Sequence, residues 1–220
     1  TDGADGTPIQ LYTAYNEYDE ARFVIDRIAQ HIERGRARAE CAILYRSNAQ
    51  SRIFEEQLIQ RGIPYRVYGG LRFFERAEIK DALGYLRLAA NRADDASFER
   101  IVNQPPRGIG ERTVDAVRQY AKGFTIPLFE AAQRVIADKA LPARALTALG
   151  EFLQLVDRLA SGIPGLELHE QVEQAIQAGA LIEHYRKEKG ERGQARIENL
   201  EELVNAARQW EPEDVGNEIE

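Results

Sequence analysis

The sequence predicts a mixed fold, in which a partial α/β unit is followed by an all-helical domain. Two patterns lead to this prediction. Residues 9–70 alternate between short apolar runs and amphipathic stretches, an order typical of α/β proteins. From residue 75 onward, apolar residues recur at the three- and four-residue spacing of helices, without the alternation of strands. We therefore expect a first domain at 1–68 and a second at 69–220.

Three apolar runs of the first domain are predicted to be strands, at 9–15, 41–46 and 65–70. The run CAILYR is continuously apolar, as expected of a buried parallel strand. Asn16 followed by Asp19 resembles a helix N-cap with an acidic residue in the first turn, so we expect a helix from there to about Gly35. A second helix is expected after residue 46 and before Gly62.

The second domain is predicted to be built from short helices. In the first of them Ile79, Leu83, Leu86 and Ala90 lie on one face. Stretches rich in proline and glycine separate the remaining helices. These helices are expected at about 95–103, 111–122, 127–137, 142–160, 167–178, 180–188 and 194–209.

Composition limits the class of protein. The chain is 44% apolar and 30% charged, which is ordinary for a globular protein. No apolar run approaches the roughly 18 residues of a membrane span, and no signal peptide is recognisable, so we expect no membrane partner. Cys41 is the single cysteine, which excludes an internal disulfide and favours a reducing, cytoplasmic setting. The sequence starts without methionine and contains none, so we expect a piece of a longer protein.

The charge is distributed unevenly along the chain. The net charge is −7, yet residues 66–122 carry eleven Lys/Arg against eight Asp/Glu, whereas 198–220 carry one Arg against eight acids. Because a local patch can bind phosphate whatever the net charge, a polyanionic partner remains possible.

The stretch NQPPRGIGERT at 103–113 is the most constrained segment of the sequence. Two prolines end the preceding helix, because the residue before a proline disfavours helical conformation. Gly108 and Gly110 let a polyanion approach the backbone, while Ile109 between them can enter the core. The next helix begins at Glu111 or Arg112, with free N–H groups at its positive end. This helix-hairpin-helix pattern can bind a DNA phosphate without reading a base.

Side chains of the same stretch add possible hydrogen-bond donors. Arg107, Arg112 and Thr113 flank the Gly-Ile-Gly and could contact the same phosphate. A glycine-terminated helix followed by a tight turn between helices would give a similar pattern without any ligand. We take phosphate binding as the working hypothesis.

The stretch YRSNAQSR at 45–52 is a second candidate site. Arg46, Ser47 and Asn48 follow a predicted strand and precede a helix, at the edge where open α/β sheets bind ligands. Arg52 lies one turn inside that helix, and the set suits a phosphodiester backbone. Ser47 or Asn48 capping the helix explains the pattern equally well, so both interpretations stay open.

No catalytic or metal-binding residue is predicted. The three histidines are scattered without ligand spacing, and no nucleophile with a neighbouring base is found. The phosphate-loop pattern G-x-x-x-x-G-K-[ST] is also absent from the sequence. We therefore expect the chain by itself to hold no cofactor and to be inactive as an ATPase.

The stretch from CAILYRSNAQSR through GYLRLAANRADDASFERIVNQPPRGIGERT, together with KGERGQARIENLEELV, closely resembles UvrD/PcrA-type superfamily 1 DNA helicases. The resemblance covers nearly the whole chain. It implies a parent protein that binds ATP and Mg²⁺ between two RecA-like domains and unwinds DNA with 3′-to-5′ polarity in repair. It also implies a bacterial, nucleoid-associated protein, with repair proteins as possible partners.

The resemblance further implies what each part of the chain does. Residues 1–68 would be part of the second RecA-like domain, 2A, and 69–220 most of the helical 2B domain, incomplete at its C-terminal end. Arg46 and Asn48 would contact the single strand. The residues implied in duplex contact are Lys80, Gly108, Ile109, Gly110 and Thr113.

Two other functions can be compared with this one. The chain could act mainly as a protein-interaction or autoinhibitory module of the helicase, with the hairpin contacting a partner or the helicase core. A helix-hairpin-helix glycosylase or lyase is excluded for want of a catalytic Lys/Asp pair.

Overall fold

The computed structural model describes residues 8–68, 70–188 and 190–210. The chain divides into two compact units, Thr1–Phe73 and Phe74–Glu220. Within the described residues, none of the helices has the length and apolar character needed to span a bilayer.

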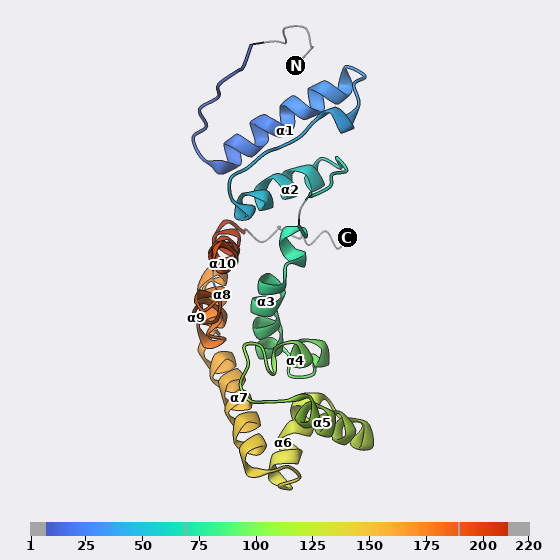
Figure 1. Ribbon diagram of the computed structural model, residues 1–220, viewed down its shortest axis with the longest axis vertical. Helices are drawn as coiled ribbons and strands as arrows, with labels where there is room; N and C mark the ends of the chain where they lie inside the picture. The colour runs from blue at the N-terminus through green and yellow to red at the C-terminus, as the bar shows by residue number, and fades with distance from the viewer. Residues whose placement is uncertain (1–7, 69, 189, 211–220) are drawn as a thin grey trace, which may run out of the picture. The chain divides into compact units, whose positions relative to one another are not determined.

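The first unit is built around two helices, α1 (Glu17–Glu33) and α2 (Ser51–Gln60), which pack against each other (Figure 1). The side chain of Asn16 accepts a hydrogen bond from the Asp19 amide at 2.8 Å, which confirms the predicted N-cap of α1. The buried apolar side chains of this unit are Ala21, Ile25, Ile53, Leu58 and Phe73. Short 3₁₀ helices lie at Arg38–Glu40, Asn48–Gln50 and Phe73–Glu75.

The predicted α/β character of this unit is wrong, because none of the described residues forms a strand. A strand exists only through backbone pairing with a neighbour, and the predicted runs have no such partner in the described part of the chain. Leu44 is 94% exposed and Ile9 fully exposed, although the strand prediction requires burial of such residues. The described residues are therefore all-helical or irregular. Gly69, at the end of the third predicted strand, lies outside the described residues.

The second unit consists of eight helices in its described part, and each of them was predicted from apolar periodicity. The helix α3 is central, because it contacts α4, α7, α8 and α10 (Figure 1). In chain order the helices are α3 (Ala77–Ala90), α4 (Asp95–Ile101), α5 (Glu111–Phe124), α6 (Leu128–Ala137), α7 (Ala143–Gly162), α8 (Leu168–Ala178), α9 (Leu181–Arg186) and α10 (Glu191–Gln209).

Large side chains fill the core of this unit. Phe98 of α4 meets Phe152 of α7 edge to face, with ring centroids 5.6 Å apart. Tyr85 of α3 and Tyr185 of α9 are fully buried as well. Aromatic pairs of this geometry stabilise a core beyond the area they bury. The α4–α5 connection, residues 102–110, is thus attached to a well-packed scaffold.

Candidate nucleic-acid interface

The α4–α5 loop, residues 102–110, is organised by one side chain, that of Asn103. Its Oδ1 accepts hydrogen bonds from the backbone amides of Arg107 at 2.7 Å and Ile109 at 3.2 Å. Asn103 is not among the predicted site residues. An asparagine ahead of a Pro-Pro turn is a recognisable signal, because asparagine side chains readily bond to backbone groups a few residues away.

The loop is also attached to the core of the second unit, through Ile109 and Tyr85. The side chain of Ile109 is 1% exposed, as the sequence predicted for an apolar residue between two glycines. The hydroxyl of Tyr85 donates to the Gln104 carbonyl oxygen at 2.7 Å. Burial raises the pKa of Tyr85 to about 12, so this hydroxyl keeps its proton at neutral pH and remains a donor. These contacts fix the position of the loop on α3.

Exposed residues of the loop and of the start of α5 have backbone amides without acceptors within the described ranges. Gly108 adopts φ +80°, a left-handed conformation that favours glycine, and both Gly108 and Gly110 are exposed. Among the described residues, the amides of Gly108, Gly110, Glu111 and Arg112 have no hydrogen-bond acceptor. Helix α5 begins there, and no side chain caps it. Unbonded amides at a helix N-terminus favour an anion.

Arg107, a predicted side-chain donor to DNA, bonds to the protein itself. The guanidinium of Arg107 donates to three backbone carbonyl oxygens, those of Ile101 at 3.4 Å, Pro105 at 2.9 Å and Gly179 at 3.0 Å. It also lies 5.5 Å from the ring centroid of Tyr85. Arg107 therefore ties the loop to the end of α8.

The other predicted duplex contacts lie on α3 and α5. Arg112 is exposed at the second position of α5, beside the unbonded amides. Thr113 is buried, and its amide donates to the Gly110 carbonyl oxygen at 2.9 Å. Lys80 is exposed on α3, five residues before Tyr85, which contacts the loop.

Polar side chains, most of them buried, join α3 to α4, α9 and α10, the link to α9 being the Tyr185 hydroxyl, which donates to Asp81 at 3.3 Å. Asn199 donates to Glu78 at 2.6 Å and accepts from Arg76 at 2.8 Å. On the same helix as Glu78, Asp81 pairs with Arg100 at 2.8 Å. Burial raises the pKa of Asp81 above its usual range, although the Arg100 charge opposes this effect. Each partner in such a network needs the others, because an unpaired buried charge is costly.

In the 45–52 segment, the capping interpretation accounts for part of the pattern. The Ser47 hydroxyl accepts from the Ala49 amide at 3.4 Å, and Gln50 Oε1 accepts from the Ser47 amide at 3.0 Å. Arg52 is buried and pairs with Glu56 at 2.8 Å within α2. Arg46 and Asn48 have exposed side chains. Of the four predicted residues, these two are accessible to a ligand.

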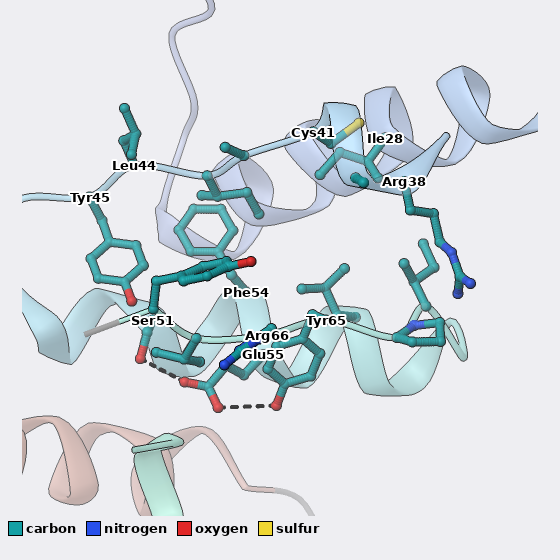
Figure 2. A pocket seen from close by; sticks show the side chains of 18 of the residues that line it. Ile28, Arg38, Cys41, Leu44, Tyr45, Ser51, Phe54, Glu55, Tyr65 and Arg66 are labelled. Carbon is teal, nitrogen blue, oxygen red and sulfur yellow. Dashed lines mark hydrogen bonds between the residues drawn. The ribbon is translucent and has the colours of Figure 1, made fainter. Parts of the chain in front are cut away.

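A cavity of about 1000 Å³ lies within the first unit. The irregular runs 41–45 and 63–68 both line it, together with residues of α1 and α2. Figure 2 shows Leu44, Tyr45 and Phe54 around this space, and Glu55 bonded to Ser51 and Tyr65 at its floor. Two of the three runs predicted to be strands therefore border an unfilled space.

No group of three or more His, Cys, Asp or Glu that could hold a metal ion is found in the part of the chain that the structure describes.

The family model for the UvrD-like helicase C-terminal domain matches residues 1–220. The chain therefore belongs to the UvrD-like helicase C-terminal domain family, and the resemblance to UvrD/PcrA-type helicases is confirmed.

Individual relatives agree with this assignment. The chain is 58% identical to DNA helicase II of Escherichia coli (strain K12) over 210 residues, which are 96% of this chain and 29% of that protein. It is 55% identical over 219 residues to DNA helicase II of Salmonella typhimurium (strain LT2), covering 100% of this chain and 30% of that protein. It is 37% identical over 214 residues to the ATP-dependent DNA helicase PcrA of Staphylococcus aureus (strain Mu50), covering 96% and 29%. The chain thus spans under a third of the length of these relatives.

Proposed function

We propose that this chain is the DNA-binding and regulatory portion of an ATP-dependent 3′-to-5′ DNA helicase that acts in DNA repair in the bacterial cytoplasm. In this proposal residues 1–68 belong to the second RecA-like domain and 69–220 to the 2B domain. ATP and Mg²⁺ would be bound by other parts of the longer protein, and no step of ATP hydrolysis is assigned to a residue of this chain.

The observation that carries the proposal is the set of outward amides in the α4–α5 loop. Gly108, Gly110, Glu111 and Arg112 offer backbone donors without acceptors in the described structure, at the positive end of a 14-residue helix. Backbone amides of this kind can bind a DNA phosphate whatever the neighbouring bases are, as a protein that moves along DNA requires. We propose that α4, the loop and α5 form a helix-hairpin-helix that contacts the duplex, with Arg112 and Lys80 adding positive charge.

We propose single-strand contacts from Arg46 and Asn48, whose side chains are exposed next to the start of α2. Ser47 would shape this turn through its capping bonds, and Arg52 would support it through Glu56. If each phosphate contact contributes about 0.9 to the slope of log affinity against log salt, two or three contacts give weak binding that falls steeply with salt.

The duplex contact is tested by Gly110→Val combined with Arg112→Ala. Gly110 has φ −83°, and a Cβ there meets no atom within 4 Å, so valine fits while covering the outward amides. We expect duplex affinity to fall, with little change in the midpoint of thermal unfolding. Affinity is measured by fluorescence anisotropy with a duplex carrying a single-stranded tail, at several salt concentrations.

A matched control changes the other end of the same helix, through Lys122→Ala with Gly123→Val. Both residues are exposed there, and a Cβ at Gly123 also meets no atom within 4 Å. Duplex affinity equal to that of the unmodified chain in the Gly110/Arg112 variant would contradict the proposed contact. If the Gly110/Arg112 variant kept its duplex affinity and changed only the unwinding rate of the full-length helicase, the loop would serve as an autoinhibitory or partner surface.

A further inference from the structure

Beside the proposed phosphate site, one arginine is surrounded by three carboxylates. Arg118 of α5 contacts Glu99 of α4 at 2.6 Å through Nε, and Glu111 at 2.6 Å and Asp115 at 2.8 Å through Nη1. All four side chains are at least a third exposed, so burial does not force this arrangement. The cluster carries two net negative charges next to amides that would hold a phosphate.

The position of Glu111 makes this cluster relevant to binding. Glu111 is the first residue of α5 and follows Gly110 directly. A carboxylate at this position is attracted to the helix N-terminus and would compete with a phosphate for the same amides. Its carboxylate instead bonds to Arg118, seven residues further along, which is about 10 Å of helix rise. No side chain caps the helix, so the amides remain open.

We propose that Arg118 is a positioning residue, which holds the Glu111 carboxylate away from the N-terminus of α5 and so keeps the anion site open. This inference rests on the proposed duplex contact of the α4–α5 loop. Arg118 itself would not touch DNA. Glu99 and Asp115 hold the guanidinium in place from either side, because each bonds to it directly.

Two other roles of Arg118 make different predictions. Arg118 could contact a phosphate directly, or it could merely tie α4 to α5 through Glu99. In either case Arg118→Gln would weaken binding by the same factor whether or not Glu111 carries its charge. In the proposed role Arg118→Gln would have little effect once the charge of Glu111 is removed, because the competing carboxylate then no longer exists.

The experiment compares Arg118→Gln, Glu111→Gln and the double variant in duplex binding by fluorescence anisotropy. We expect Arg118→Gln to bind about fivefold more weakly, the scale of an exposed charge interaction. Glu111→Gln should bind more tightly than the unmodified chain, because the backbone amide of residue 111 stays in place while the competing negative charge is removed. The double variant, whose net charge equals that of the unmodified chain, should regain most of the lost affinity. Arg134→Gln, which removes an exposed arginine paired with Glu130 on α6, is the control for the loss of one positive charge.

The results separate this inference from the proposed function. A double variant as weak as Arg118→Gln overturns the positioning role and leaves the duplex contact standing, provided that the unmodified chain binds and the Gly110/Arg112 variant does not. An Arg118→Gln variant that loses no more affinity than Arg134→Gln also overturns it. If the unmodified chain fails to bind duplex DNA at low salt, both the duplex contact and the role of Arg118 are refuted.

Discussion

At the scale of single residues, the α4–α5 loop depends on Asn103 more than on the residues that define its sequence pattern. The Asn103 carboxamide accepts from two loop amides, while Ile109 occupies the core beneath them. Arginine is the residue type most readily linked to DNA, yet the two arginines at 107 and 112 have different surroundings. Arg107 bonds to protein carbonyls, whereas Arg112 is exposed.

Asn103→Ala should therefore weaken both stability and binding. It leaves the Arg107 and Ile109 amides without their acceptor, which costs about 1–3 kcal/mol of unfolding free energy when such groups are partly buried. Urea denaturation measures the first effect and duplex anisotropy the second. Asn91→Ala is the matched control, because Asn91 Oδ1 accepts a single bond from the Ala93 amide at an exposed turn. Equal effects of the two substitutions would show that Asn103 does not organise the loop.

At the scale of elements, each helix of the second unit was predictable because its cause lies within its own sequence. Apolar spacing sets its position, and in α4 a capping residue, Asp94, adds to this. Its carboxylate accepts from the Ser97 amide at 3.0 Å and the Ser97 hydroxyl at 2.6 Å, so α4 begins at Asp95. The strand predictions for the first unit are wrong, since a strand needs a distant partner that an apolar run alone does not specify.

The cap of α4 should make stability depend on acidity. Hydrogen bonds from the Ser97 hydroxyl and then the Ser97 amide lower the pKa of the Asp94 carboxyl below its ordinary value. A lowered pKa means that the stabilisation is present above about pH 4 and is lost as pH falls through the folded-state pKa. Asp94→Asn keeps an acceptor but no charge, so its unfolding free energy should fall less steeply below pH 4. Acid titrations followed by circular dichroism compare the two, with Asp138→Asn as the control for net charge.

For the candidate site, the sequence predicted the loop but not the direction of every side chain. The sequence indicated that residues 103–113 form a constrained loop between two helices, and the buried Ile109 agrees with it. The direction of the Arg107 side chain could not be predicted, because a bonding partner elsewhere in the fold sets it. Arg52 instead pairs with Glu56 four residues along the same helix, a spacing that is visible in the sequence. For Arg107 that partner is the Gly179 carbonyl, 72 residues away in the chain.

At the scale of the whole molecule, the two units differ in how much core each possesses. Among the described residues, five buried apolar side chains lie in Thr1–Phe73 and thirty in Phe74–Glu220. The first unit also contains the cavity of about 1000 Å³. Since burial of apolar surface is the main source of stability, the first unit has far less to maintain its fold.

Native-state hydrogen exchange should detect this difference. We expect amides of α1 and α2 to exchange through openings of lower free energy than those of α3 and α7. Mass spectrometry of the intact 220-residue chain, digested after timed labelling, measures both sets at once. Phe152→Ala removes a core ring of the second unit at a cost of about 3–5 kcal/mol. It should therefore reduce the difference in opening free energy between the helices of the two units. Equal protection of the two sets in the unmodified chain would contradict the expectation.

The α4–α5 loop has a consequence for how its function can be mapped. Its amides alternate: those of Arg107 and Ile109 are bonded to Asn103, while those of Gly108 and Gly110 have no acceptor among the described residues. A scan that replaces side chains with alanine leaves every amide donor in place, so it would miss a contact made by the backbone. Proline at position 110 removes that donor, and φ −83° lies close to the angle that its ring imposes. If the proposed contact is made by peptide N–H groups, substitutions that cover or remove an amide, such as Gly110→Val and Gly110→Pro, test it more directly than an alanine scan.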